Sequence, residues 1–150
     1  MENTVSKRIE DELDKHGTYA TNTVGVSMRP LFKTRRDVVV LKTPDRRIKK
    51  YDVVMYVDSA DRYILHRVIG ERDGVYVIRG DNTFKKEYVP KNRVIAYMVS
   101  FNRNGKHRTA EDFSYKLYSR VWNLIYPVRF LFNKFFALCR KTKRIFKKSA

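Results

Sequence analysis

The chain has 150 residues, with 33 Lys and Arg against 16 Asp and Glu, and a formal net charge of +17. This length fits one domain, with or without a terminal extension, and such a domain can bury a core without metal or disulfide staples. The single cysteine, Cys139, excludes an internal disulfide framework and any cysteine-based zinc site. The excess of positive charge predicts attraction to a polyanion, which is nucleic acid, an anionic membrane surface or an acidic peptide.

Residues 1–17 are expected to form a short amphipathic helix. Val5, Ile9 and Leu13 recur at every fourth position, and Gly17 follows where a helix commonly ends at a glycine. The many charged residues of this segment make it too polar for a signal peptide or a membrane span.

Residues 18–102 predict a mainly β domain. The segment holds six short runs rich in Val, Ile and Tyr, and turn signals separate them. Because little helix is expected between the runs, an antiparallel sheet is favoured. The expected strands are 21–26, 38–42, 53–57, 63–68, 75–79 and 94–101.

Residues 103–150 are expected to form a linker followed by a basic amphipathic helix. The polar stretch 102–109 marks the boundary. Between residues 115 and 150 there are ten basic residues and no acidic residue. Apolar side chains from Leu117 to Leu138 fall at helical spacing on one stripe, and Pro127 is expected to kink the helix.

The composition of this C-terminal segment favours an anionic membrane surface as a partner. An apolar helix face beside dense Lys and Arg is typical of a helix that lies in the membrane interface. Arg129 and Lys134 interrupt the apolar run too often for a membrane-spanning helix. Two alternatives remain open: the stripe packs on the β domain and the basic end is solvated, or the tail contacts nucleic acid.

Two residues of the β domain suggest nucleophilic chemistry. Ser27 lies in a Gly/Pro-containing turn after an expected strand, where it can present its hydroxyl and its backbone N–H to one point. His66 lies within an apolar run, where partial burial keeps an imidazole neutral and able to accept a proton. The alternatives are an ordinary turn serine and a structural core histidine.

A third motif, Gly-Asp-Asn at 80–82, directly follows the expected strand 75–79. Its Asp81 can orient His66, pair with Arg67 or form an Asx turn. Arg67 is expected to point to the opposite face of its strand from His66, because side chains alternate along a strand.

Four boxes, in this order, resemble those of the type I signal peptidases. Ser-Met-Arg-Pro at 27–30 matches the nucleophile box, and His-Arg-Val-Ile-Gly at 66–70 matches the box of the general base. Gly-Asp-Asn at 80–82 matches a third box, and Tyr-Asp-Val-Val at 51–54 matches a fourth, without its usual glycine. The resemblance covers residues 21–101, and the histidine at position 66 is similar to the type found in the endoplasmic reticulum, archaea and sporulating bacteria.

The resemblance implies a serine endopeptidase that needs no cofactor and no metal. Ser27 is implied to attack the scissile carbonyl while His66 takes its proton, giving an acyl-enzyme that water hydrolyses. In the histidine type an acid lies a few residues beyond the Gly-Asp-Asn box. Glu87 occupies that position and is favoured over Asp81 as the residue that orients His66.

The resemblance also implies that the substrate peptide binds as an added strand. Residues 21–26 and 63–66 are the expected walls of the binding groove. Val26, Met28 and Leu65 are the residues expected to contact the substrate.

The family's anchor helix before the serine box is replaced here by the charged helix at residues 4–16. We therefore expect a cytoplasmic peptidase that rests on the inner membrane face through residues 117–138 and cuts a peptide or a membrane-associated protein. One alternative is a peptide-binding module of the same fold without turnover. Another is a nucleic-acid binder that uses the basic tail, in the manner of the self-cleaving repressors that share a related domain. No helix-turn-helix is readable before the β domain, which disfavours nucleic acid as a partner.

Overall fold

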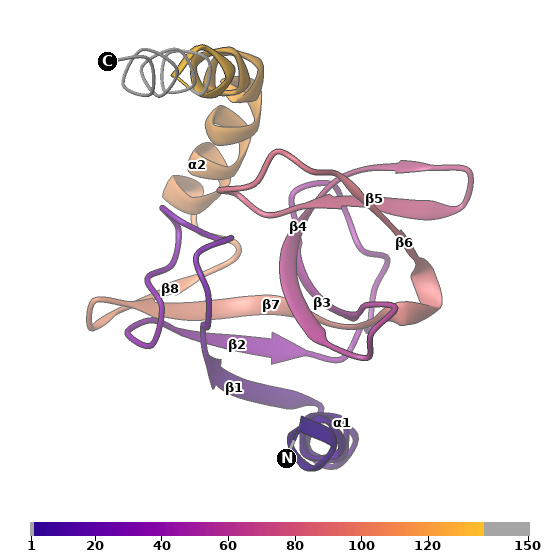
Figure 1. The fold of residues 1–150 in the computed structure, drawn as a ribbon. Coiled ribbons are helices and arrows are strands. Elements are labelled where there is room, and N and C mark those ends of the chain that lie inside the picture. The colour runs from indigo at the N-terminus through magenta and orange to yellow at the C-terminus, as the bar shows by residue number, and fades with distance from the viewer. Residues whose placement is uncertain (1, 137–150) are drawn as a thin grey trace, which may run out of the picture.

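The computed structural model describes residues 2–136. The chain forms a mainly antiparallel β domain with a helix at its N-terminal end and two helical segments at its C-terminal end (Figure 1). This confirms the predicted fold class. In chain order the elements are α1 (Glu2–His16), β1 (Thr18–Asn22), β2 (Val38–Lys42), β3 (Val53–Val57), β4 (Tyr63–Arg72), β5 (Val75–Arg79), β6 (Glu87–Pro90), a 3₁₀ turn (Lys91–Arg93), β7 (Val94–Arg103), β8 (Lys106–Thr109) and α2 (Phe113–Leu124).

The strands form one strongly curled sheet in the order β1-β2-β7-β3-β4-β5-β6, with β8 paired to β7 (Figure 1). Every pairing is antiparallel. Strand β3 lies at the centre, and four of its five residues are buried because both of its faces are covered. Its alternate residues enter two different core clusters, with Val53 and Met55 in one and Val54 and Tyr56 in the other.

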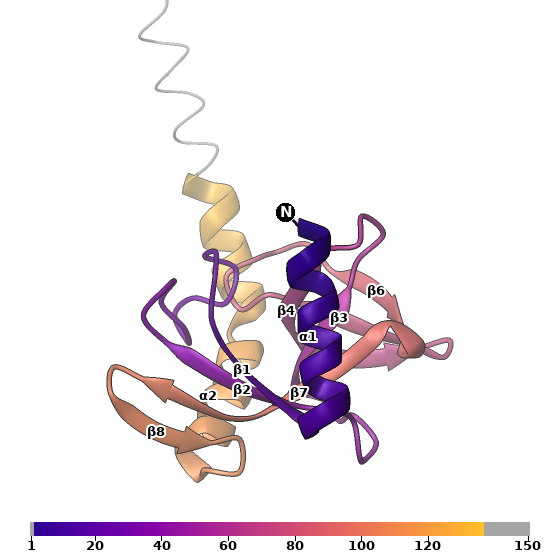
Figure 2. The same ribbon diagram turned by 90° about the horizontal axis from the view of Figure 1, so that it is seen from below.

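Helix α1 ends as expected at Gly17. The glycine has a φ of +65°, and its N–H donates to the carbonyl of Leu13 at 2.7 Å, which closes the last turn of the helix. Ile9 and Leu13 are buried in the larger core cluster. The helix therefore packs on the β domain through the apolar face that its spacing predicts, and it contacts β1 (Figure 2).

The expected strand at 21–26 is wrong in its position. The strand is β1, Thr18–Asn22, which pairs with β2 from Thr18 opposite Lys42 to Asn22 opposite Val38. Residues 23–26 lie in the loop that follows, where Gly25 has a φ of +88° that an extended strand does not contain. Ser27 is therefore presented by a long loop and not by the end of a strand.

The boundary expected at residues 102–109 is also wrong. Strands β7 and β8 form a hairpin there, closed by Asn104 and Gly105, which both have positive φ. Two-residue hairpin loops of this kind favour Asn-Gly because both positions need positive φ. The β domain therefore extends to Thr109, and the C-terminal helices begin directly after it.

The C-terminal segment bends at the end of α2. Ile125 is not helical, and residues 126–136 then form a second helical segment that runs in a different direction (Figure 1). Pro127 lies in the first turn of that segment, where proline is tolerated because its missing N–H needs no partner. The predicted kink is confirmed. Leu138 and the basic cluster that follows it lie outside the described residues.

Candidate active site

The loop that carries Ser27 is held in place by the residue after Asp81. The backbone N–H of Asn82 donates to the carbonyl of Ser27 at 2.7 Å, and the Asn82 amide Nδ2 donates to the carbonyl of Val26 at 3.2 Å. Both bonds join a loop near the N-terminus to the segment after β5, more than fifty residues later. Asn82 therefore fixes the backbone that presents the Ser27 side chain.

His66 lies on β4 and is buried, with 7% of its surface exposed. Its Nδ1 lies 3.0 Å from the Glu87 Oε2 at the start of β6. An ionised carboxylate only accepts hydrogen bonds, so this contact places the ring proton on Nδ1 and leaves the lone pair on Nε2. His66 is thus oriented as a base, with Nε2 as the accepting atom.

Tyr56 provides a second donor to the same carboxylate. Its hydroxyl donates to Glu87 and also lies 3.4 Å from the Nδ1 of His66. Burial, followed by the hydrogen bond to Glu87, raises the pKa of the Tyr56 hydroxyl well above its usual range. Tyr56 therefore keeps its proton and holds the Glu87 carboxylate against the imidazole.

Gly80 lies between the Ser27 backbone and the His66 ring. A Cβ at position 80 would lie 2.7 Å from the Ser27 carbonyl oxygen and 3.0 Å from the His66 Nε2. Real side chains do not tolerate such contacts, so only glycine allows the nucleophile loop and the imidazole to come this close together. The glycine of the Gly-Asp-Asn motif thus has a steric role in the site.

Asp81 does not contact His66. It forms a two-bond ion pair with Arg67, with Nε to Oδ1 and Nη2 to Oδ2 both at 2.8 Å, and both side chains are almost completely buried. Burial alone would lower the pKa of Arg67, but the charges of Asp81 and Tyr115 and the hydrogen bonds to them together outweigh it, and the net shift of the pKa is upward. Of the roles left open for Asp81, the structure shows pairing with Arg67, and Glu87 is the acid that contacts His66.

The Arg67–Asp81 pair is also the point where α2 joins the β domain. The Arg67 Nη1 donates to the Tyr115 hydroxyl at 3.0 Å and to the Ser119 Oγ at 2.9 Å, and the Tyr118 hydroxyl donates to Asp81 at 3.0 Å. The helix therefore docks through a polar and aromatic face, and the apolar stripe described above points elsewhere.

Two further side chains of the C-terminal segment contact the backbone of Asp81. The Trp122 Nε1 and the Arg129 Nη2 both donate to its carbonyl oxygen at 2.9 Å. The guanidinium of Arg129 also lies 3.8 Å from the centre of the Trp122 ring. Because Asp81 is followed by Asn82, the C-terminal helices are connected to the Ser27 loop through these two residues.

A cavity of about 410 Å³ lies beside these groups and is lined by Ser27 and His66. Its walls come from residues 21–25 on one side and 63–66 on the other, together with apolar side chains that include Ile9 and Phe32. The cavity brings the two expected groove walls together with the candidate nucleophile and base.

Both walls offer a strand edge without a partner in the described part of the chain. Strand β1 is the terminal strand of the sheet. Residues 64–66 of β4 pair with β3 alone among the strands, because the pairing of β4 with β5 begins at Arg67. Unpaired N–H and C=O groups at such edges can bind an extended peptide by strand addition.

The structure places two of the three expected substrate residues in the cavity. Met28, which is buried, and Leu65 line it. Val26 is not among the residues that line it and is 53% exposed, and its contact with the substrate stays a prediction.

Sequence reasoning did not identify Tyr56, Trp122 or Arg129 as residues that contact the site. Tyr56 lies two residues beyond Val54, which is the residue of β3 that pairs with His66, so the two side chains are diagonal neighbours. This neighbourhood depends on the register between β3 and β4, which no local motif specifies. Trp122 and Arg129 lie in the helical segment that the sequence pattern predicts to rest on a membrane surface.

The site uses oxygen and nitrogen side chains suited to proton transfer. Within residues 9–136, no group of three or more His, Cys, Asp or Glu side chains is placed to hold a metal ion. No helix in that part of the chain is long and apolar enough to cross a membrane.

No protein-family model matches the sequence, and no curated protein matches it.

Proposed function

We propose that this protein is a serine endopeptidase of the signal-peptidase type that cleaves a peptide or a membrane-associated protein. The observation that supports it most strongly is the arrangement around His66. Glu87 binds its Nδ1, and its Nε2 is the atom that approaches Gly80 beside the Ser27 backbone. Ser27 and His66 come from boxes 39 residues apart in the sequence and line one cavity.

The proposed reaction has two steps. The Ser27 Oγ attacks the carbonyl carbon of the scissile peptide bond, and its proton passes to the His66 Nε2. The imidazolium then protonates the leaving amine as the C–N bond breaks, which leaves an ester on Ser27. In the second step His66 takes a proton from water and the resulting hydroxide attacks the ester. The imidazolium then returns that proton to the departing Ser27 oxygen as the C–O bond breaks, which releases the carboxylic acid product and regenerates Ser27 and neutral His66.

The substrate is proposed to bind as an extended strand between the edge of β1 at residues 21–22 and the edge of β4 at residues 64–66. Such binding uses mainly backbone hydrogen bonds, so sequence preference arises where side chains enter the cavity. The lining residues Met28, Phe32, Met55 and Leu65 are apolar, which favours apolar residues at the cleavage site.

The test is to incubate the detergent-solubilised protein with a peptide library and to identify fragments by mass spectrometry. We expect cleavage by the wild type and none by Ser27→Ala. The matched control is Ser59→Ala, an exposed serine in a turn between β3 and β4, which should cleave like the wild type. Equal fragment patterns from wild type and Ser27→Ala would refute the proposed reaction.

We further propose that the protein associates with an anionic membrane surface through the C-terminal helices. Nine apolar residues of this segment are between 45% and 79% exposed: Phe113, Leu117, Val121, Leu124, Val128, Leu131, Phe132, Phe135 and Phe136. A soluble protein rarely leaves so many neighbouring apolar side chains in water. The charge of the chain is complementary to anionic lipid.

This second part is tested by flotation with lipid vesicles. Leu131→Asn combined with Phe135→Asn removes apolar surface from the exposed stripe and should lower the vesicle affinity by about tenfold or more. The matched control is Tyr88→Asn, which changes an aromatic side chain of similar exposure on β6. If the double variant and the control bind vesicles equally, the exposed stripe is not a membrane contact.

A further inference from the structure

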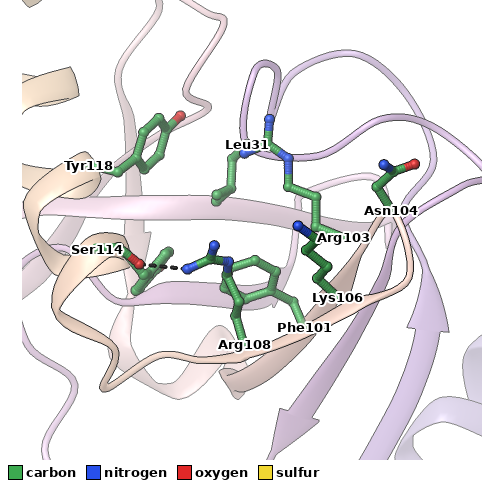
Figure 3. A pocket seen from close by; sticks show the side chains of 9 residues that line it. Leu31, Phe101, Arg103, Asn104, Lys106, Arg108, Ser114 and Tyr118 are labelled. Atoms are coloured by element: carbon green, nitrogen blue, oxygen red, sulfur yellow. Dashed lines mark hydrogen bonds between the residues drawn. The ribbon is translucent and has the colours of Figure 1, made fainter.

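A second cavity, of about 360 Å³, lies between the β7–β8 hairpin and α2 (Figure 3). Three basic side chains, Arg103, Lys106 and Arg108, line it, and Figure 3 shows all three extending from the hairpin around the same hollow. None of the residues that line this cavity lines the Ser27 cavity. Its residues form a concentrated positive site within the structurally described part of the chain.

The register of the hairpin places the three cations on one face. Arg103 pairs directly with Lys106, and Phe101 pairs with Arg108, two residues along each strand. Because side chains alternate across a strand, these four residues project to the same side, and the buried Phe101 turns that side toward the core. Arg103 and Lys106 are therefore like charges in directly opposite positions, an arrangement that destabilises a hairpin.

The three side chains are exposed, so water screens part of this repulsion, and no carboxylate of the described structure offsets the rest. None of the three cations forms an ion pair within residues 9–136, whereas Arg46, Arg62 and Arg67 each pair with an aspartate. Arg108 donates to the Ser114 Oγ at 2.7 Å, which fixes its guanidinium at the edge of the cavity (Figure 3). A site that breaks a local rule of stability in this way is expected to be functional, and an anion is the ligand that would relieve the repulsion.

Apolar side chains lie beside the three cations in and around the cavity. Leu31, Phe101 and Tyr115 form part of its lining and are buried. Ser114 and Tyr118 of α2 line its other side, and Leu117 and Val121 lie next to them on the helix surface, about half exposed. The positive site thus adjoins the exposed apolar stripe of the C-terminal helices.

We infer that this cavity binds the phosphate group of an anionic phospholipid. The phosphate oxygens accept hydrogen bonds from Arg103, Lys106 and Arg108, since guanidinium and ammonium groups make strong charge-assisted bonds to phosphate. The acyl chains extend along Leu117 and Val121. A nucleic acid backbone would instead need a track of cations and would leave the neighbouring apolar stripe in water. This inference rests on the membrane part of the proposed function and not on its catalytic part.

The experiment compares two double variants that remove the same charge. Arg103→Gln with Lys106→Gln alters the cavity, and Arg47→Gln with Arg72→Gln removes two exposed cations elsewhere on the β domain. Each protein is floated with phosphatidylcholine vesicles that contain phosphatidylglycerol. We expect the cavity variant to bind at least about tenfold more weakly than the matched control. Its melting temperature should be no lower than that of the wild type, because the variant removes a repulsion.

Two competitors identify the source of the phosphate. Soluble glycerol phosphate should compete weakly with vesicles, because it lacks the acyl chains that contact α2. If glycerol phosphate displaces the protein from vesicles as well as an anionic lipid does, the ligand is a free phosphate ester and the lipid assignment is wrong. If the cavity variant loses affinity for single-stranded DNA but keeps its vesicle affinity, the partner is nucleic acid.

Equal vesicle binding by the cavity variant and the matched control would overturn the inference altogether. Peptide cleavage measured in detergent tests the enzymatic proposal independently of vesicle binding, so a failure of one proposal can be told from a failure of the other. The cavity variant should retain wild-type cleavage there, since none of its altered residues lines the Ser27 cavity.

Discussion

Glu87 Oε2 lies 3.0 Å from His66 Nδ1, so the acid of the candidate site comes from the start of β6 and not from the Gly-Asp-Asn motif. Glu87→Gln replaces the carboxylate with an amide that no longer stabilises an imidazolium. We expect kcat for peptide cleavage to fall by about 10²-fold or more, with little change in stability because the side chain is one-third exposed. Glu71→Gln, which alters a surface glutamate, is the control. A Glu87→Gln protein with wild-type kcat would remove Glu87 from the mechanism.

Asp81 is expected to act on stability more than Glu87 does. Asp81→Asn leaves the fully buried Arg67 without its counter-ion, and breaking a buried pair of this kind costs about 3–5 kcal/mol. Asp73→Asn alters an exposed ion pair and should change the free energy of unfolding by less than about 0.5 kcal/mol. Urea denaturation of both variants measures the difference, and a loss below about 1 kcal/mol for Asp81→Asn would contradict this account.

Gly80 is predicted to be required for activity rather than for folding. The Cβ of Gly80→Ala would push apart the Ser27 backbone and the His66 ring, and a displacement of this size near the reacting groups lowers a rate by about 10²-fold. Gly70→Ala is a matched control on β4, because a Cβ there meets no atom within 4 Å and the φ is negative. Kinetic measurements that find both variants equally active would show that the tight approach around Gly80 has no catalytic importance.

The C-terminal helices are predicted to support the active site through Trp122. Trp122→Phe removes the hydrogen bond to the Asp81 carbonyl but retains a ring to stack on Tyr118. We expect a stability loss of about 1 kcal/mol and a several-fold lower kcat, because Asn82 then holds the Ser27 loop less firmly.

Tyr126→Phe is the comparison for Trp122→Phe. It removes a similar bond, to the carbonyl of Phe84, three residues beyond Asp81. It should reduce stability by a similar amount and leave kcat nearly unchanged. If the two variants lower kcat equally, the helices stabilise the domain without positioning the site.

Much of the β domain could be predicted from the sequence. Strands β2, β3 and β5 have the predicted bounds, because each is a compact run of β-branched and aromatic residues between turn signals. Strand β8 was missed since its residues, Lys106–Thr109, are polar, although the Asn104-Gly105 pair is a strong hairpin signal. Strand β6 has only four residues and ends at a proline, so its local pattern is weak.

The candidate site could be predicted only in part. Ser27 and His66 belong to boxes that are readable as motifs, and Glu87 follows from its distance beyond one of them. The contacts of Tyr56 and Trp122 depend on strand register and on the docking of α2, which are tertiary features. The polar residues of α2 also pack inward, since Arg67 and Asp81 need partners there, whereas the apolar residues stay outside.

The most direct test of the central claim is a double-mutant comparison at Ser27 and His66. Cleavage of the best peptide from the library is measured for the wild type, Ser27→Ala, His66→Ala and the double variant, with folding checked by urea denaturation. If the two residues act as one unit, each single variant and the double variant lose activity to the same extent, by about 10³-fold or more. Losses that multiply in the double variant, or a Ser27→Ala protein that still cleaves, would contradict the account.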